Sequence, residues 1–113
     1  MSNGHDLYLE IQNKIRYLDE AIRQLADRGR AYAQSEHDYK IALAKQMLIE
    51  RDAGKPATII PDLCRGNREV AKLRFDRDVA EVVYKSAQEA INSAKLQLRI
   101  LDAQMAREWG AAK

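Results

Sequence analysis

The sequence predicts an all-α protein, a long antiparallel two-helix hairpin of coiled-coil type with a short structured connector, and three observations support this. Hydrophobic residues make up 46% of the 113 residues and charged residues 32%, a balance that favours long amphipathic helices. Both prolines and two of the five glycines lie in one stretch, Gly54 to Gly66. On either side of it the chain lacks proline and repeats apolar residues at helical spacing.

The first helix is expected over residues 5–52 of a single domain. Asn3 or Asp6 can cap its start, because a short side-chain oxygen accepts hydrogen bonds from backbone N–H groups that lack an intrahelical partner. Helix-breaking residues appear only at Gly29 and from Asp52 to Gly54. Steps of three and four residues predict a seam at Tyr8, Ile11, Ile15, Leu18, Ile22, Leu25, Gly29, Tyr32, Glu36, Tyr39 and Leu43.

The connector, residues 53–66, is expected to contain a short turn of helix. Thr58 would cap this turn, Pro61 is tolerated near its start, and Gly66 would end it. Its apolar side chains would then cover the end of the helix pair. These side chains are Ile59, Ile60 and Leu63.

The second helix is expected over residues 67–109, with Asn67 as its cap and Gly110 as its stop. Its apolar residues follow the same spacing as those of the first helix. The predicted seam contains Val70, Leu73, Arg77, Ala80, Tyr84, Ala87, Ile91, Ala94, Leu98, Leu101 and Met105.

A fold-back around residue 59 or 60 sets the expected register of the two helices. It pairs Gly29 with Ile91, so that the missing side chain of Gly29 makes room for a bulky one. It also places Glu36 opposite Tyr84, in a buried polar layer that would fix the register.

Two helices cannot cover all the apolar residues of this chain. Several lie beside or outside the seams and would be exposed in a monomer. We therefore expect a homo-oligomer, such as a four-helix bundle, or docking on another protein. The uncovered residues are Ile41, Leu48, Ile49, Phe75, Val79, Val82, Val83, Leu96, Ile100 and Ala103.

Catalytic chemistry has no visible motif in this sequence. His5 and His37 lie far apart and outside any metal-binding pattern, and Cys64 has no catalytic histidine beside it in the sequence. No glycine-rich phosphate loop is present. We therefore expect a non-enzymatic protein with no catalytic residues, no cofactor and no metal.

Charge and hydropathy indicate which binding partners and which compartment to expect for this protein. The 19 basic and 17 acidic residues are intermingled and give a formal charge of +2, so no general attraction to nucleic acid or anionic membrane is expected. No apolar run approaches the roughly 20 residues that span a bilayer. The first residues lack a basic stretch followed by an apolar one, which favours the cytoplasm.

A basic cluster surrounds the predicted connector. It is either a solvated helix end of mixed charge or a surface that contacts nucleic-acid phosphates. Asp52, Asp62, Glu69 and Asp76 accompany its basic members, which are Arg51, Lys55, Arg65, Arg68, Lys72, Arg74 and Arg77.

The stretch from Arg51 to Trp109, beginning RDAGKPATIIPDLCRG, resembles small helical proteins encoded by phages and prophages of Gram-positive bacteria, as does the whole chain. The resemblance carries no catalytic residues. It implies expression in the bacterial cytoplasm and a protein that acts by binding.

The first hypothesis for function is protein–protein interaction with a host or phage protein, for example inhibition of an antiviral nuclease such as a CRISPR effector. Arginine and aromatic residues dominate binding hot spots. The candidate partner-binding residues are accordingly Arg65, Arg68, Lys72, Phe75 and Trp109, each with a structural alternative as cap, core or dimer interface. Two other hypotheses are an accessory DNA-binding protein of phage recombination or replication, acting through the basic tip, and a structural coiled-coil assembly factor.

Overall fold

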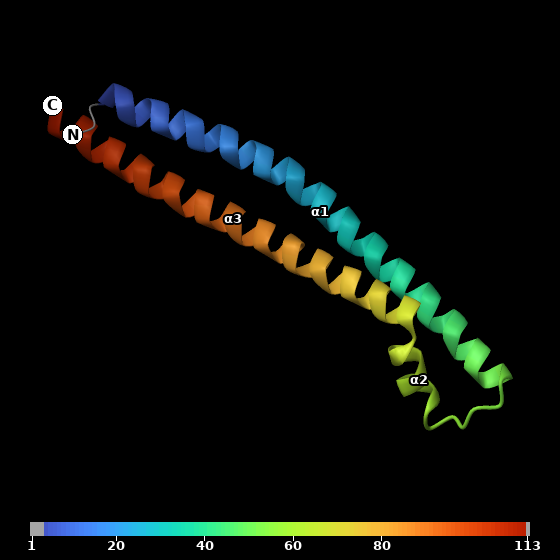
Figure 1. The fold of residues 1–113 in the computed structure, drawn as a ribbon. Helices are drawn as coiled ribbons and strands as arrows, with labels where there is room; N and C mark the ends of the chain where they lie inside the picture. Colours follow the sequence, from blue (N-terminus) through green and yellow to red (C-terminus); the bar gives the residue numbers. More distant parts are fainter. Residues whose placement is uncertain (1–3, 113) are drawn as a thin grey trace. The chain divides into compact units, whose positions relative to one another are not determined.

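The computed structural model describes residues 4–112 and confirms the predicted all-α helical hairpin (Figure 1). Its helices are α1 (Gly4–Asp52), α2 (Ile60–Gly66) and α3 (Arg68–Ala112). The predicted limits agree to within one residue, except at the end of α3. Gly110 was expected to stop that helix but lies inside it. The predicted cap Asn3 lies outside the described residues, and Asp6 lies in the first turn of α1.

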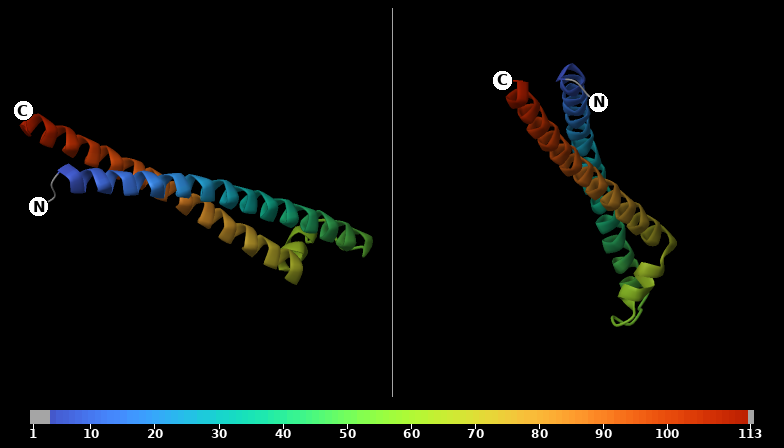
Figure 2. Two further views of the ribbon diagram at one scale, coloured as in Figure 1. Left: turned by 90° about the horizontal axis from the view of Figure 1, so that it is seen from above. Right: turned by 90° about the vertical axis from the view of Figure 1, so that its left-hand side faces the viewer.

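Contacts divide the chain into two compact units. The terminal unit combines α1 up to Asp27 with α3 from Lys85 onward. The connector unit is Arg28–Tyr84 and holds α2 with the adjoining parts of both long helices. Figure 2 follows the course of the chain in two further views.

A glycine-dependent turn ends α1 as predicted. Gly54 has a φ of 80°, a conformation that costs a residue with a side chain about 1–2 kcal/mol. Its N–H donates to the carbonyl oxygen of Arg51 at 3.0 Å, and the N–H of Lys55 donates to that of Glu50 at 3.2 Å. This bonding pattern satisfies carbonyl groups that the end of a helix leaves without partners.

Helix α2 packs through a different face from the one predicted. Ile59, not Thr58, stands at its N-cap position and makes no side-chain capping bond, while Pro61 lies in the first turn as expected. Ile60 and Cys64 are one turn apart, so they share a face, and both are buried. Ile59 and Leu63 point elsewhere and stay exposed, so of the three predicted covering residues only Ile60 fills that role.

Asn67 caps α3 as predicted. Its side-chain Oδ1 accepts hydrogen bonds from the backbone N–H groups of Glu69 and Val70, both at 3.1 Å. Because Asn67 follows Gly66 directly, the cap sets the point at which the chain leaves α2 and enters α3.

The seam of α3 is confirmed at every predicted position, since all of these residues are buried or half-buried. In the terminal unit the predicted seam of α1 is confirmed at Ile11, Leu18 and Leu25, which are half-buried. It is wrong at Tyr8, Ile15 and Ile22, which are exposed. Leu7 is buried instead, and Ala21 lies beside Ala87 and Ala90 of α3. Small side chains at these three positions need little space between the two helices, whereas Ile22 in the place of Ala21 would need more.

The predicted register is also wrong. A Cβ built on Gly29 would lie 3.2 Å from Cε2 of Tyr84, so Gly29 makes room for Tyr84 and not for Ile91. Tyr84 packs near Tyr32, with ring centroids 6.0 Å apart, and not against Glu36. Glu36 is half-exposed and pairs with Lys40 at 3.4 Å, so no buried Glu36–Tyr84 layer forms.

The shape of the connector explains this shift. A symmetric fold-back would place the end of α1 level with the start of α3. In the connector unit, α1 instead continues past the start of α3, and α2 lies near this end of α1 (Figure 1). Leu43 and Met47 of α1 therefore line one depression together with Pro61 of α2 and Arg74 of α3.

Candidate functional site

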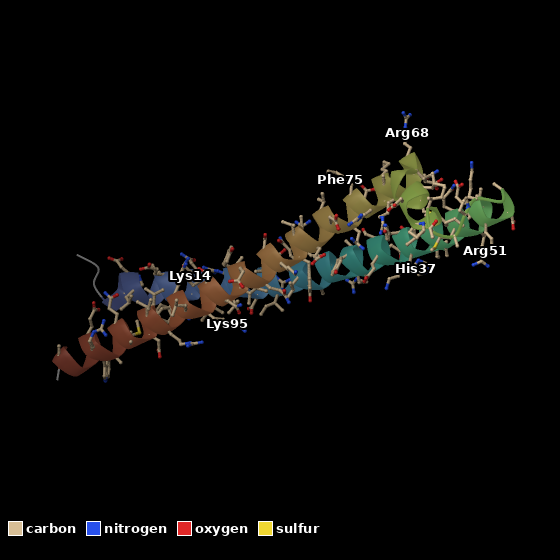
Figure 3. All side chains as sticks on the ribbon, turned by 90° about the horizontal axis from the view of Figure 1, so that it is seen from below. Lys14, His37, Arg51, Arg68, Phe75 and Lys95 are labelled. Carbon is tan, nitrogen blue, oxygen red and sulfur yellow. The ribbon has the colours of Figure 1, made fainter. Side chains whose placement is uncertain are left out.

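The outer stripe of α3 consists of Arg68, Lys72, Phe75, Val79 and Val82. These residues are spaced by four and three positions, so they share one face of the helix, and all are exposed. Figure 3 shows Arg68 and Phe75 pointing away from α1. The seam residues of α3 occupy the opposite face, so the hairpin itself makes no use of the outer stripe.

The apolar part of the outer stripe is unusually exposed. Phe75, Val79 and Val82 are 65%, 45% and 64% accessible. Single apolar residues on a surface need no explanation, but a contiguous group on one helix face is typical of a contact surface. Helix recognition commonly uses anchors at this spacing.

The connector end of the stripe is positively charged. Nζ of Lys72 lies 3.2 Å from Oδ2 of Asp76, which balances its charge. The side chain of Arg68 is exposed and makes no hydrogen bond or ion pair with residues 4–112. The guanidinium of Arg68 is therefore available to an acidic group of another molecule.

A second feature of the connector unit, the arginine pocket, is a cavity of about 260 Å³ between its three helices. Three arginines line it together with one aromatic and three apolar side chains, and no acidic residue does so. The lining residues are Tyr39, Leu43, Met47, Pro61, Arg65, Arg74 and Arg77.

Two of these arginines are held by aspartates outside the lining. Nε and Nη2 of Arg77 donate to Oδ1 of Asp78 at 3.1 and 2.8 Å, and its Cζ lies 4.7 Å from the centroid of the Tyr39 ring. Nη2 of Arg65 donates to Oδ1 of Asp62 at 2.7 Å. These hydrogen bonds raise the pKa of both guanidiniums above the usual value, so both stay charged.

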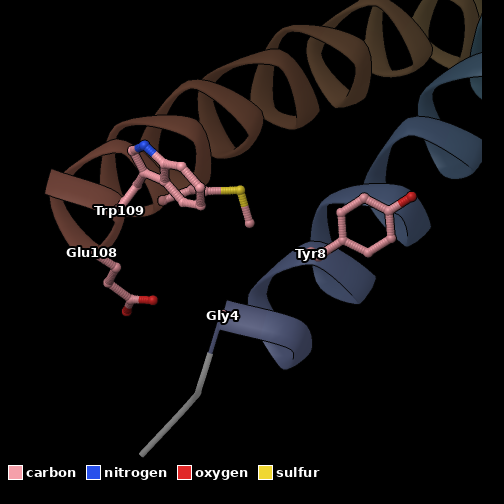
Figure 4. A pocket seen from close by; sticks show the side chains of 5 residues that line it. Gly4, Tyr8, Glu108 and Trp109 are labelled. Atoms are coloured by element: carbon pink, nitrogen blue, oxygen red, sulfur yellow. The ribbon is translucent and has the colours of Figure 1, made fainter. Parts of the chain in front are cut away.

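Trp109 belongs to the terminal unit, and its site differs in character. It is 69% exposed and borders an apolar cavity of about 420 Å³ that Gly4, Tyr8, Met105 and Glu108 also line (Figure 4). The five predicted partner-binding residues thus fall in three places. Arg68, Lys72 and Phe75 share the outer stripe, Arg65 lines the arginine pocket, and Trp109 lies in the terminal unit.

The sequence-based selection omitted residues that the structure adds to these sites. Val79 and Val82 could have been found by extending the helical spacing from Arg68 through Phe75. Arg74 and Tyr39 could not have been found in this way, because only the position of α2 makes them neighbours around one pocket.

In the part of the chain that the structure describes, three observations concern metal ligands, the cysteine thiol and membrane spans. No three His, Cys, Asp or Glu side chains there converge as metal ligands. Cys64 is fully buried, which disfavours its attack on a substrate. The described helices include none with the length and hydropathy of a membrane span.

Comparison of this chain with family models, with curated proteins and with solved structures returned no match in any of the three.

Proposed function

We propose that this chain is a non-enzymatic interaction protein that binds another protein through the outer stripe of α3. The observation that carries the proposal is the row of five exposed residues, with cations at one end and apolar side chains at the other. A partner that fits this surface presents an apolar helix face or groove with acidic residues beside Arg68.

A pull-down with matched variants tests this proposal. Tagged full-length protein is incubated with nuclease-treated bacterial lysate, and retained proteins are quantified by mass spectrometry. Phe75→Glu places a carboxylate in the middle of the stripe, and Ile100→Glu places one at a similarly exposed apolar position of the terminal unit. We expect a discrete protein that the native chain and Ile100→Glu retain and Phe75→Glu loses. The same retained proteins with all three chains would contradict the proposal.

A second candidate function is nucleic-acid binding at the connector end. Two further cations, Arg51 and Lys55, are exposed there and have no ion pair among the described residues. Binding of this kind weakens steeply with salt, because cationic side chains release counterions from phosphates. Retention that disappears after nuclease treatment, together with salt-sensitive DNA binding by the purified chain, would favour this function over the first.

We also propose that two copies of the chain associate, through a different surface. Ile41 and Leu48 lie two turns apart on α1, are 56% and 57% exposed, and lie opposite the seam residue Tyr39 on the helix. Pairing of two copies through this face of α1 leaves the outer stripe of α3 open to the partner.

The resemblance to phage and prophage proteins suggests a more specific version of the first hypothesis. In this version the partner is a host or phage protein in the bacterial cytoplasm, such as an antiviral nuclease that the chain inhibits. This version rests on the sequence resemblance alone, and identification of the retained protein tests it directly.

A further inference from the structure

We propose that the arginine pocket receives one carboxylate, the side chain of a glutamate on the protein partner. This inference rests on the proposed function, because the partner supplies the glutamate. Arg74 and Phe75 are adjacent in α3, so a protein seated on the outer stripe comes close to the pocket.

The balance of charge in the pocket indicates a single negative charge. Asp78 balances Arg77, and Asp62 balances Arg65. Arg74 lines the same pocket, and its side chain makes no hydrogen bond or ion pair with the described residues. One positive charge therefore remains, which matches a carboxylate better than a phosphate, whose charge at neutral pH is about −1.5 to −2 when it is a monoester.

The pocket also has hydrogen-bond donors to spare. A guanidinium carries five N–H groups, and the bonds to Asp78 use only Nε and Nη2 of Arg77. The N–H groups of the Arg74 guanidinium make no hydrogen bond to the described residues, so all five are available to a ligand. Arginine binds a carboxylate through two parallel hydrogen bonds, so Arg74 can hold both oxygens while a neighbouring arginine adds a further bond.

The walls and size of the pocket favour an amino-acid side chain. Leu43, Met47 and Pro61 provide an apolar wall for the methylene groups of a glutamate. The volume of about 260 Å³ is smaller than the roughly 300–1,000 Å³ of most small-molecule sites. Nucleic acid is instead held by many phosphate contacts along its backbone, so a single pocket with an apolar wall does not suit it.

NMR titration of the full-length chain tests the pocket without a partner. The Nε–H signals of the arginines are followed while N-acetylglutamate amide is added, and the neutral N-acetylglutamine amide and inorganic phosphate are added in parallel at equal ionic strength. We expect saturable shifts at Arg74 and at Arg65 or Arg77 with the glutamate probe only. Stronger saturation with phosphate, or no saturable shift with any probe, would overturn the inference.

Two variants test whether the glutamate probe binds in the pocket. Arg74→Gln removes the unbalanced charge of the pocket, and we expect it to weaken the glutamate titration at least about tenfold, since a hydrogen bond to a charged group contributes about 1.5–3 kcal/mol. Arg99→Gln is the control, because it removes an exposed charge from the same helix outside both the pocket and the outer stripe. Equal titration of both variants and the native chain would contradict a pocket site.

The pull-down distinguishes failure of this inference from failure of the proposed function. If the pocket receives a glutamate of the partner, Arg74→Gln retains less of the protein whose capture depends on Phe75. Undiminished capture by Arg74→Gln would remove the pocket from the interface and leave the outer stripe as the proposed binding surface. If the native chain and Phe75→Glu retain the same proteins, this result counts against the proposed function, whatever the NMR titration shows.

Discussion

At the scale of single residues, Gly29 has the most specific structural role. An interior helical glycine is about 1 kcal/mol less favourable than alanine. Glycine nevertheless suits this position, because the ring of Tyr84 lies against the space that a side chain would fill. The tyrosine ring is held in turn by its contact with Tyr32.

Replacement of Gly29 tests this packing. In a Tyr84→Leu background, which withdraws the ring, we expect Gly29→Ala to raise the free energy of unfolding by about 1 kcal/mol. In the native background the gain should be smaller, because the new methyl group presses on Cε2 of Tyr84 at 3.2 Å. Urea unfolding of all four proteins at one protein concentration measures both changes. An equal gain in the two backgrounds would show that Tyr84 does not constrain this position.

At the scale of the elements, α2 determines how the connector unit is assembled. It is too short to be stable alone, so its order depends on the burial of Ile60 and Cys64. The same docking places Pro61 and Arg65 against α1 and α3 and so forms the arginine pocket. Any change that releases α2 is therefore expected to disrupt that pocket.

The reactivity of the Cys64 thiol provides a measure of this docking. Loss of a buried isoleucine side chain costs about 2–5 kcal/mol, and each 1.4 kcal/mol corresponds to about a tenfold change in an equilibrium. We therefore expect Ile60→Ala to raise the rate at which Ellman's reagent labels Cys64 by at least about tenfold. Leu63→Ala is the matched control in the same helix, because Leu63 is 38% exposed whereas Ile60 is 8% exposed. Similar labelling rates in the two variants would argue against the docking of α2 through Ile60.

At the scale of the whole molecule, the proposed self-association needs exposed area, which the chain has. The chain exposes 8388 Å², whereas a folded monomer of 12.9 kDa exposes about 6,300 Å². Long paired helices expose more surface than a compact domain of the same mass, and the excess of about 2,000 Å² is larger than the roughly 800 Å² that each partner contributes to an interface of standard size. Pairing with a second copy and binding of a further protein can both be accommodated within this area.

Light scattering during size-exclusion chromatography tests the assembly. We expect the native chain to elute as a dimer or larger oligomer and Leu48→Glu to elute as a monomer, since a charge would then lie in the proposed α1 contact. Phe75→Glu should remain oligomeric. If Phe75→Glu dissociates and Leu48→Glu does not, the second copy occupies the outer stripe and the assignment of the two surfaces is reversed.

The sequence by itself determined the elements of this protein. Helix limits follow from local chemistry, such as the side-chain oxygen of Asn67 at the start of α3 and the glycine at position 54 after the end of α1. The seam of α3 follows from periodicity, because its residues recur at steps of three and four along the whole helix, which keeps them on one face. The exposure of Phe75 and Val82 follows from the same periodicity, since they lie opposite that seam.

Only the tertiary structure decided which residues face one another. In the terminal part of α1, apolar side chains occur at adjacent positions, so periodicity alone could not choose Leu7 and Ala21 over Tyr8 and Ile22. The partner of Gly29 depended on how far α1 extends beyond the start of α3, which the docking of α2 sets. The arginine pocket depended on the same docking, because its side chains come from three helices and meet only when contacts distant in sequence fix their positions.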